Sequence, residues 1–217
     1  MSYNYSATLN PEKALIWRIV HRDNIPWLLD NGLHCGNSTM TCPTWIPIGN
    51  PELISKRATH PVPFMPGGYL NDYVPFYFTP FSPMLLNITS GRGVPQRTSD
   101  QIVLLVSSLH RVRELGLNYL FTDMHAYYQW ASFYHDLADL QRIDWPILQA
   151  RNFSRDVNDP AKFERYQAEA LIYRHCPVEA VLGMICYDDN TLQQLKQWLG
   201  QRQLNLPVHA RPDWYFS

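Results

Sequence analysis

The stretch Phe163-Glu164-Arg165-Tyr166-Gln167-Ala168-Glu169-Ala170-Leu171-Ile172-Tyr173 joins a short helix to an apolar strand. Asp159-Pro160 precedes it, and proline is favoured in the first turn of a helix, so we expect a helix from there to about Gln167. Residues 168–173 then read as a strand with Glu169 at its head. A carboxylate entering an apolar strand must be exposed or partnered, because desolvation penalises its charge. Glu169 is therefore either a surface glutamate or a carboxylate aimed into a cleft.

The rest of the chain predicts a mixture of strands and helices around this segment. We expect strands at residues 15–20, 73–81, 102–107, 119–122, 181–187 and 208–216, and helices at residues 23–31, 123–141 and 191–199. No regular strand–helix alternation is visible, which favours the α+β class over a doubly wound sheet. A length of 217 residues suits one domain, and we expect residues 1–217 to form it.

Two segments attract separate expectations. Residues 36–68 are dense in Pro, Gly, Asn, Thr and Ser, which predicts a long irregular excursion of the kind that often covers a ligand. Residues 123–141 carry apolar side chains at steps of three and four, from Ala126 through Trp130 to Leu140. That spacing predicts an amphipathic helix with Asp123 as its cap and Trp130 in the core.

Composition excludes several classes of protein. The formal net charge is −1, so the whole chain is not a polycation for nucleic acid, and no apolar run is long enough to span a membrane. The four cysteines show neither a CxxC pair nor zinc-ligand spacing, so we expect reduced thiols, no metal site and a cytoplasmic protein. The chain also lacks the GxGxxG, Walker, HExxH and GxSxG motifs.

Four strings nevertheless resemble one family, in order and over essentially the full length. They are Trp17-Arg18-Ile19-Val20-His21-Arg22-Asp23-Asn24-Ile25-Pro26-Trp27, Val74-Pro75-Phe76-Tyr77-Phe78-Thr79-Pro80-Phe81-Ser82-Pro83-Met84-Leu85, Phe121-Thr122-Asp123-Met124-His125-Ala126 and Arg165-Tyr166-Gln167-Ala168-Glu169-Ala170-Leu171. The chain is similar to the DarT toxins of the DarTG toxin–antitoxin systems. The resemblance implies an ADP-ribosyltransferase fold, with split antiparallel sheets, flanking helices and NAD in the cleft between the sheets.

The resemblance also implies the activity: transfer of ADP-ribose from NAD, the co-substrate, to a thymidine base in short single-stranded DNA motifs, which blocks replication. The family's catalytic glutamate falls on Glu169 and its lid arginine on Arg57, within an NAD-covering element at about residues 40–60. Without the resemblance, Arg57 would read as a solvated loop residue. Cofactor contacts are implied for Arg18, Ile19, Val20, His21, Trp27 and Arg57.

Two further features concern the nucleotide contact, where this chain departs from many relatives, and the segment that the resemblance implies presents the acceptor. Many relatives have His-x-Thr where this chain has Arg18-Ile19-Val20, so His21 is expected to take over part of the contact with the nucleotide. The segment at about residues 127–169 is expected to present the acceptor. Stacking rings and basic groups there suit single-stranded DNA, and the expected contacts are Tyr127, Tyr128, Arg151, Arg155 and Arg165, although Tyr127 also suits core packing.

Three other readings compete with DNA modification. The same chemistry could act on RNA or protein, the chain could be an inactive nucleic-acid-binding module, or it could bind a partner without any small-molecule cleft. The family also implies one protein partner, a DarG antitoxin whose macrodomain removes the modification. Release of nicotinamide in the presence of each acceptor separates these readings.

Overall fold

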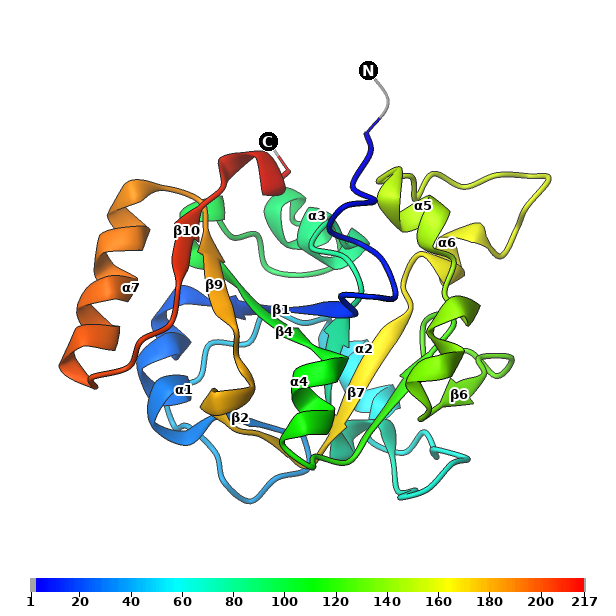
Figure 1. Cartoon of the computed structure of the whole chain (residues 1–217), viewed down its shortest axis with the longest axis horizontal. Helices are drawn as coiled ribbons and strands as arrows, with labels where there is room; N and C mark the ends of the chain where they lie inside the picture. The colour runs from blue at the N-terminus through cyan, green and yellow to red at the C-terminus, as the bar shows by residue number, and fades with distance from the viewer. Residues whose placement is uncertain (1–2, 217) are drawn as a thin grey trace.

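The computed structural model describes residues 3–216 and has an α+β architecture (Figure 1). Its strands are β1 (Leu15–His21), β2 (Leu33–His34), β3 (Tyr73–Tyr77), β4 (Ile102–Ser108), β5 (Tyr119–Thr122), β6 (Phe133–Tyr134), β7 (Glu169–Tyr173), β8 (His175–Cys176), β9 (Gly183–Cys186) and β10 (Val208–Ala210). Its α-helices are α1 (Ile25–Asn31), α2 (Pro51–Arg57), α3 (Pro83–Ser90), α4 (Leu109–Glu114), α5 (Trp145–Gln149), α6 (Lys162–Arg165) and α7 (Asp189–Gln201). Short 3-10 helices lie at Arg22–Asn24, Leu70–Asp72, Ser99–Gln101, Leu137–Arg142, Val178–Ala180 and Pro212–Trp214.

The main sheet is divided into two halves. Its strand order is β10-β9-β4-β1-β3-β7-β5-β6, and every neighbouring pair is antiparallel except β10 with β9. β1 pairs with β4 along its whole length, whereas β1 and β3 meet at one pair of residues, Trp17 and Tyr77. The two halves therefore diverge beside β1 and β3, which confirms the expected split-sheet fold. The small sheet pairs β2 with β8.

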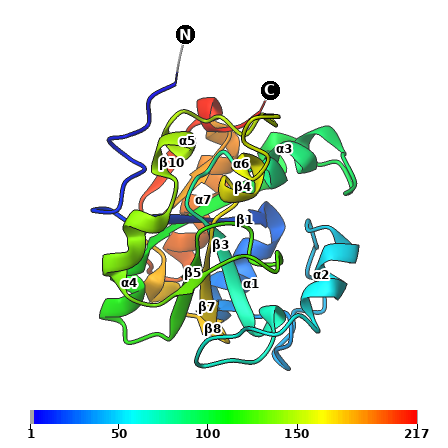
Figure 2. The same cartoon turned by 90° about the vertical axis from the view of Figure 1, so that its right-hand side faces the viewer.

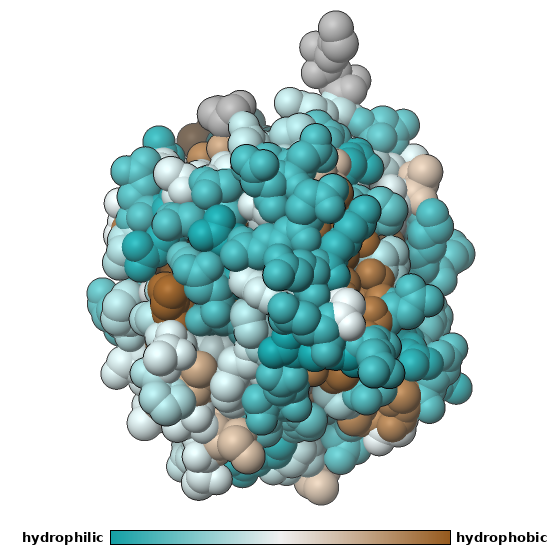
Figure 3. Space-filling view, turned by 90° about the vertical axis from the view of Figure 1, so that its left-hand side faces the viewer, coloured by the Kyte–Doolittle hydropathy of each residue, from teal (hydrophilic) through white to brown (hydrophobic). Residues whose placement is uncertain are grey.

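Apolar strands hold the two halves together. Ile16, Phe76 and Leu104 come from three neighbouring strands and are fully buried in one large cluster of core side chains. α7 contacts α1 and β10 and turns its buried residues inward. The face that carries α7 is mostly hydrophilic (Figure 3), as expected for a helix with one buried side.

Most predicted elements are confirmed, with shifted ends. The strands at residues 102–107 and 119–122 match β4 and β5, and the helix at residues 191–199 is the centre of α7. The strand predicted to end at residue 216 stops at Ala210, because Pro212 starts a 3-10 helix. The irregular stretch at residues 36–68 contains α2, which begins with the Asn50 side chain accepting a hydrogen bond from Leu53 N at 3.0 Å.

The helix predicted at residues 123–141 is wrong. Asp123 does not cap a helix: its carboxylate accepts hydrogen bonds from Ser132 N at 3.0 Å and Tyr134 OH at 3.4 Å. These bonds close a run of turns, and β6 then pairs with β5. Trp130 is consequently 63% exposed rather than in the core. Within residues 3–216, no helix is long and apolar enough to cross a membrane.

Candidate active site

A cavity of about 490 Å³ opens where the two halves of the sheet diverge. β1, β3 and β7 form its inner wall, and the segment from Met40 to Arg57 covers it. Figure 2 shows α2, the helix of that segment, at the periphery of the molecule, beyond β3. All the residues expected at the cofactor or in catalysis line this cavity: Arg18, Ile19, Val20, His21, Trp27, Arg57 and Glu169.

Glu169 lies at the floor of the cavity and is 1% exposed, so it is not a surface glutamate. Arg57 Nη1 donates a hydrogen bond to its Oε1 at 3.1 Å, and Arg57 Nη2 lies 3.1 Å from its Oε2. The backbone N–H of Ala126 also donates to Oε1, at 3.0 Å. Burial alone would raise the pKa of Glu169, but the Arg57 guanidinium and these hydrogen bonds hold the pKa below its ordinary value.

His125 is the third group at the carboxylate, and sequence analysis did not single it out as a site residue. Its Nδ1 is 3.5 Å from Glu169 Oε1 and accepts a hydrogen bond from Tyr127 N at 3.2 Å. Burial lowers the pKa of His125, so the ring is neutral near pH 7 with its proton on Nε2. The only signal in the sequence was its place in the string Phe121-Thr122-Asp123-Met124-His125-Ala126.

Two arginines that line the cavity have buried donor atoms without a hydrogen-bond partner. Arg18 sits between the diverging halves of the sheet, and its Nη1 donates to Pro75 O, on β3, at 2.8 Å. Arg18 Nε is buried without a hydrogen-bond partner, and so is Arg57 Nη2, whose approach to Glu169 lacks hydrogen-bond geometry. Two guanidiniums against one carboxylate leave this end of the cavity positive. The donor set therefore fits an anionic, oxygen-rich ligand such as a dinucleotide.

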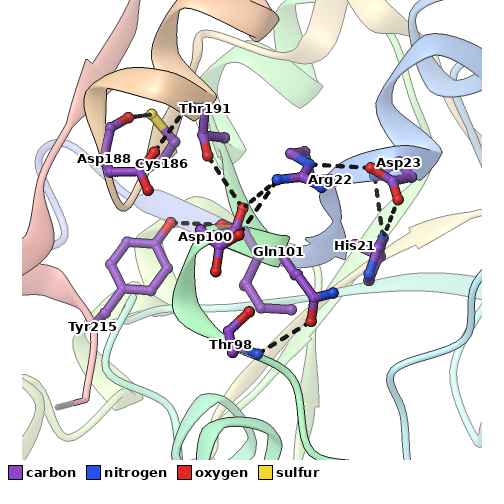
Figure 4. Close-up of polar contacts among 11 residues, drawn as sticks. His21, Arg22, Asp23, Thr98, Asp100, Gln101, Cys186, Asp188, Thr191 and Tyr215 are labelled. Carbon is purple, nitrogen blue, oxygen red and sulfur yellow. Dashed lines mark hydrogen bonds and ion pairs between the residues drawn. The ribbon is translucent and has the colours of Figure 1, made fainter.

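His21 faces the cavity from the end of β1 and is held by a polar network (Figure 4). Its Nδ1 accepts a hydrogen bond from Asp23 N at 3.2 Å, so the neutral ring carries its proton on Nε2. Arg22 bonds the Asp23 carboxylate and the backbone oxygen of Asp100, which Thr191 of α7 also bonds. Burial lowers the pKa of His21, which makes the ring a neutral hydrogen-bond donor near pH 7.

Besides the contact between Arg57 and Glu169, the covering segment is tied to the 3-10 helix that follows β1. Asn24 Nδ2 donates to Ile46 O at 2.9 Å, and Ile46 N donates back to Asn24 Oδ1 at 2.9 Å. Trp27 extends this anchorage, because its ring meets Trp45 edge-to-face at 5.8 Å and His34 at 5.7 Å. These rings give the cavity an aromatic wall opposite the charged end.

The five expected DNA contacts divide into two groups. Tyr127 and Tyr128 follow His125 in the same turn, and Arg155 lies close enough to Tyr128 to influence its pKa, which burial raises. Arg151 instead packs over the rings of Tyr3, Phe81 and Phe216, with distances of 5.1, 4.3 and 4.6 Å to the ring centres. Arg165 is bonded to Asp144 and Asp159, at 2.9 and 2.7 Å. Contacts within the chain thus occupy Arg151 and Arg165.

No group of three or more His, Cys, Asp or Glu side chains is placed to hold a metal ion in the part of the chain that the structure describes. All four cysteines are free thiols. The site thus offers one buried carboxylate that can stabilise developing positive charge, two guanidiniums that can bind an anionic group, and two neutral imidazoles that can donate hydrogen bonds.

Comparisons with known proteins agree with this geometry. A family model described as "ssDNA thymidine ADP-ribosyltransferase, DarT" matches residues 17–216. The chain is 64% identical to a DNA ADP-ribosyl transferase of Escherichia coli O127:H6 (strain E2348/69 / EPEC) over 218 residues, covering 100% of each chain. It also matches the solved structure of Thermus sp. 2.9 DarT in complex with ADP-ribosylated ssDNA (TM-score 0.88, 33% identity, 100% of each chain). The structure of Thermus sp. 2.9 DarT in complex with NAD+ matches with a TM-score of 0.82 and 33% identity, covering 95% of this chain and 99% of that chain.

Proposed function

Because the chain belongs to the DarT family of single-stranded DNA thymidine ADP-ribosyltransferases, we propose that Glu169 and Arg57 form the centre that transfers ADP-ribose from NAD to DNA. The protein is an NAD-dependent transferase, and its acceptor is a thymidine base in single-stranded DNA. We propose that residues 1–217 form one domain. One observation carries the assignment of residues: a carboxylate that is 1% exposed lies at the floor of the cavity and is paired with the arginine of the covering segment.

We place NAD along the cavity with its nicotinamide ribose at Glu169. A volume of about 490 Å³ is within the ordinary range for a ligand site. The guanidiniums of Arg18 and Arg57, which both line the cavity, supply positive charge for the pyrophosphate. His21 Nε2–H supplies a neutral donor, and Ile19, Val20 and Trp27 supply apolar surface for the rest of the nucleotide. His21 thereby contributes a polar contact that Val20 cannot make.

Transfer requires the bond between nicotinamide and ribose C1′ to break, and nicotinamide leaves with the bonding electrons. Positive charge then develops on the ribose, as in glycoside cleavage. Glu169 is ionised, since its pKa is held low, and its carboxylate can accept a hydrogen bond from the ribose 2′-hydroxyl and stabilise that charge. An atom on the base edge then bonds C1′ and releases a proton, for which Glu169 is the acceptor near at hand.

Arg57 serves this reaction through its guanidinium. Of the two roles open to it, base or positioning residue, we propose that it binds an anionic group and orients Glu169. It orients Glu169 before NAD binds, through the hydrogen bond at 3.1 Å, and its free Nη2 donor can bond the dinucleotide once NAD lies between α2 and β7. Through Arg57, the covering segment thus places a positive charge near the pyrophosphate and orients the carboxylate of Glu169.

We assign the acceptor to the turn that follows β5. Tyr127 and Tyr128 provide rings there, and Arg155 provides a cation for the phosphate backbone. A base edge is hidden by pairing in a duplex, so single-stranded DNA avoids the cost of opening one. Arg151 and Arg165 instead hold the shape of the segment between β6 and β7.

Family membership also supports two finer proposals. We propose that a bulky ADP-ribose on thymine blocks replication, so that the enzyme acts as a toxin, and that a DarG macrodomain antitoxin is the partner that controls it. Four free thiols fit a cytoplasmic location, where thiols stay reduced.

The proposed function is tested by mass spectrometry of oligonucleotides after incubation with NAD. Single-stranded DNA containing thymine should gain the mass of one ADP-ribose, whereas the same sequence without thymine should not. RNA of equal sequence and a protein mixture serve as competing acceptors. Equal labelling of RNA or protein would reject the DNA assignment, and release of nicotinamide without any transfer would reject it too.

A further inference from the structure

Trp130 is the large aromatic side chain that the fold leaves most open, at 63% exposed. Its ring stacks on Tyr128, with ring centres 5.4 Å apart and an angle of 28° between planes. Within residues 3–216, Tyr128 is the only ring that meets it, so the opposite face of the indole is open. Burying this indole would stabilise the fold, yet the indole stacks on a second ring and remains exposed to solvent.

A row of rings connects this indole to the catalytic carboxylate. Tyr128 meets His125 edge-to-face, with ring centres 5.7 Å apart and an angle of 82°. His125 Nδ1 lies 3.5 Å from Glu169 Oε1. His125, Tyr128 and Trp130, here called the aromatic row, therefore lead from the floor of the active site to the surface.

The row is held in place by the backbone rather than by packing. Tyr128 N donates to His125 O at 3.1 Å, and Ala131 N donates to Tyr128 O at 3.1 Å, so the row lies on two successive turns. The Asp123 carboxylate closes the segment through Ser132 N at 3.0 Å. The backbone that carries Trp130 is thus fixed by bonds that do not depend on its side chain.

A cation near the row suits a phosphate backbone beside stacked bases. Tyr128 OH donates to Glu164 Oε1 at 3.5 Å, which directs the phenol edge inward and leaves the ring faces for stacking. Arg155 is near enough to Tyr128 to act on its pKa and is itself held over the Phe163 ring at 4.8 Å. An aromatic face next to a cation is the arrangement that binds single-stranded nucleic acid.

We propose that the open face of Trp130 stacks on a nucleobase next to the thymine that is modified. The inference rests on the proposed function, in that it takes single-stranded DNA as the acceptor, and it adds a positioning residue outside the cavity. Because every base has a π face, Trp130 reads the presence of a neighbouring base rather than its identity. By holding that neighbour, it separates the target base from the stack and points it toward Glu169.

The test uses a set of oligonucleotides that contain a single thymine, in which the base at one neighbouring position at a time is replaced by an abasic sugar. For each oligonucleotide, kcat and KM for transfer are measured with the wild type and with Trp130→Ala. At one position next to the thymine, the wild type should lose about tenfold or more in kcat/KM, mainly through KM. Trp130→Ala should show that loss with the intact oligonucleotide and no further loss when the same base is removed. Trp130→Phe should restore part of the difference.

Leu182→Ala is the matched control, because Leu182 is also exposed, at 39%, and lies outside the cavity and the aromatic row. Its abasic profile should equal that of the wild type. Thermal melting of Trp130→Ala should match the wild type, since the side chain is mostly in solvent. A Trp130→Ala profile that falls at the same position by the same factor as the wild type would overturn the stacking role.

Failure of the inference and failure of the proposed function look different in this experiment. If the wild type transfers ADP-ribose but Trp130→Ala still loses activity at every abasic position that affects the wild type, the proposed function is supported and the stacking role of Trp130 is rejected. If the wild type modifies no thymine oligonucleotide, the proposed function falls. Fluorescence anisotropy of labelled oligonucleotides then tests the stacking role of Trp130 by itself. Equal affinity of the wild type and Trp130→Ala overturns that role, and weaker binding by the variant supports it.

Discussion

Arg57 and Glu169 are 112 positions apart in the sequence and form a buried ion pair across the cavity, with Nη1 to Oε1 and Nη2 to Oε2 distances of 3.1 Å. The arginine ends α2 of the covering segment and the glutamate begins β7. Any movement of the cover therefore changes the surroundings of the carboxylate. Ligand access and the charge state of Glu169 depend on the same contact.

Glu169→Gln should lower the rate of ADP-ribose transfer about a hundred- to a thousandfold, since the amide cannot stabilise the sugar cation as a carboxylate does. The fold should persist, because the amide oxygen can still accept a hydrogen bond from Arg57. Labelled NAD with a thymine oligonucleotide measures the rate, and circular dichroism checks the fold. A folded variant with wild-type activity would remove Glu169 from the mechanism.

The stability contributed by Glu169 should depend on pH. Its folded-state pKa lies below the ordinary value of 4.5, so the contribution is full above about pH 4.5 and is lost as pH falls through the folded pKa. Glu169→Gln has no such contribution. Urea unfolding between pH 3 and pH 7 should therefore show the wild type and the variant converging as pH falls below about 4.5. A constant difference across that range would contradict the lowered pKa.

Arg57→Lys should retain the positive charge but lose the two-point geometry at Glu169. A lysine ammonium cannot present two donors in one plane, so we expect transfer to fall about tenfold or more while the melting temperature changes little. Arg57→Ala should lose activity further. Lys56→Ala, one residue earlier and half-exposed, is the control and should behave like the wild type. Unfolding of Arg57→Lys would assign the residue a purely structural role.

Asn24→Ala should loosen the covering segment while Arg57 and Glu169 remain unsubstituted. Two hydrogen bonds to Ile46 are lost, each worth on the order of 1 kcal/mol. We expect KM for NAD to rise about fivefold or more and proteolysis within residues 36–58 to accelerate. Saturating NAD should restore most of the rate and protect the segment. A change confined to kcat would argue against a cover held at Asn24.

Arg151→Ala and Arg155→Ala should separate structure from DNA binding. Arg151 lies over three rings, so its loss should lower the free energy of unfolding by about 1–2 kcal/mol and leave oligonucleotide affinity unchanged. Arg155→Ala should weaken oligonucleotide binding and reduce its dependence on salt. Chemical denaturation and anisotropy at two salt concentrations measure both effects. Equal loss of affinity in the two variants would return Arg151 to the DNA surface.

Elements with one strong local signal were predicted well. The continuous apolar run of β4 and the capped, periodic residues of α7 are each explained by their own sequence. The prediction of a helix around Trp130 was wrong because the same three- and four-residue spacing also suits turns followed by an edge strand. The hydrogen bonds from Ser132 N and Tyr134 OH to the Asp123 carboxylate stabilise the turns and the strand instead. Helix α2 was hidden within a segment rich in proline and glycine, although Asn50-Pro51 was a start signal.

By itself, the sequence determined the class of fold, the family, and the carboxylate at the head of an apolar strand, because these depend on short strings and local periodicity. Only the tertiary structure decided which groups meet that carboxylate: Arg57 from the cover, His125 from a turn and Ala126 through its backbone. It also distinguished Arg155, which lies near Tyr128, from Arg151 and Arg165, which are engaged by aromatic rings and by carboxylates. The sequence alone gives no reason to treat these three arginines differently. The physical reason is that pKa values and ligand contacts depend on distance and burial, and residues more than a hundred positions apart become neighbours only when the strands pair.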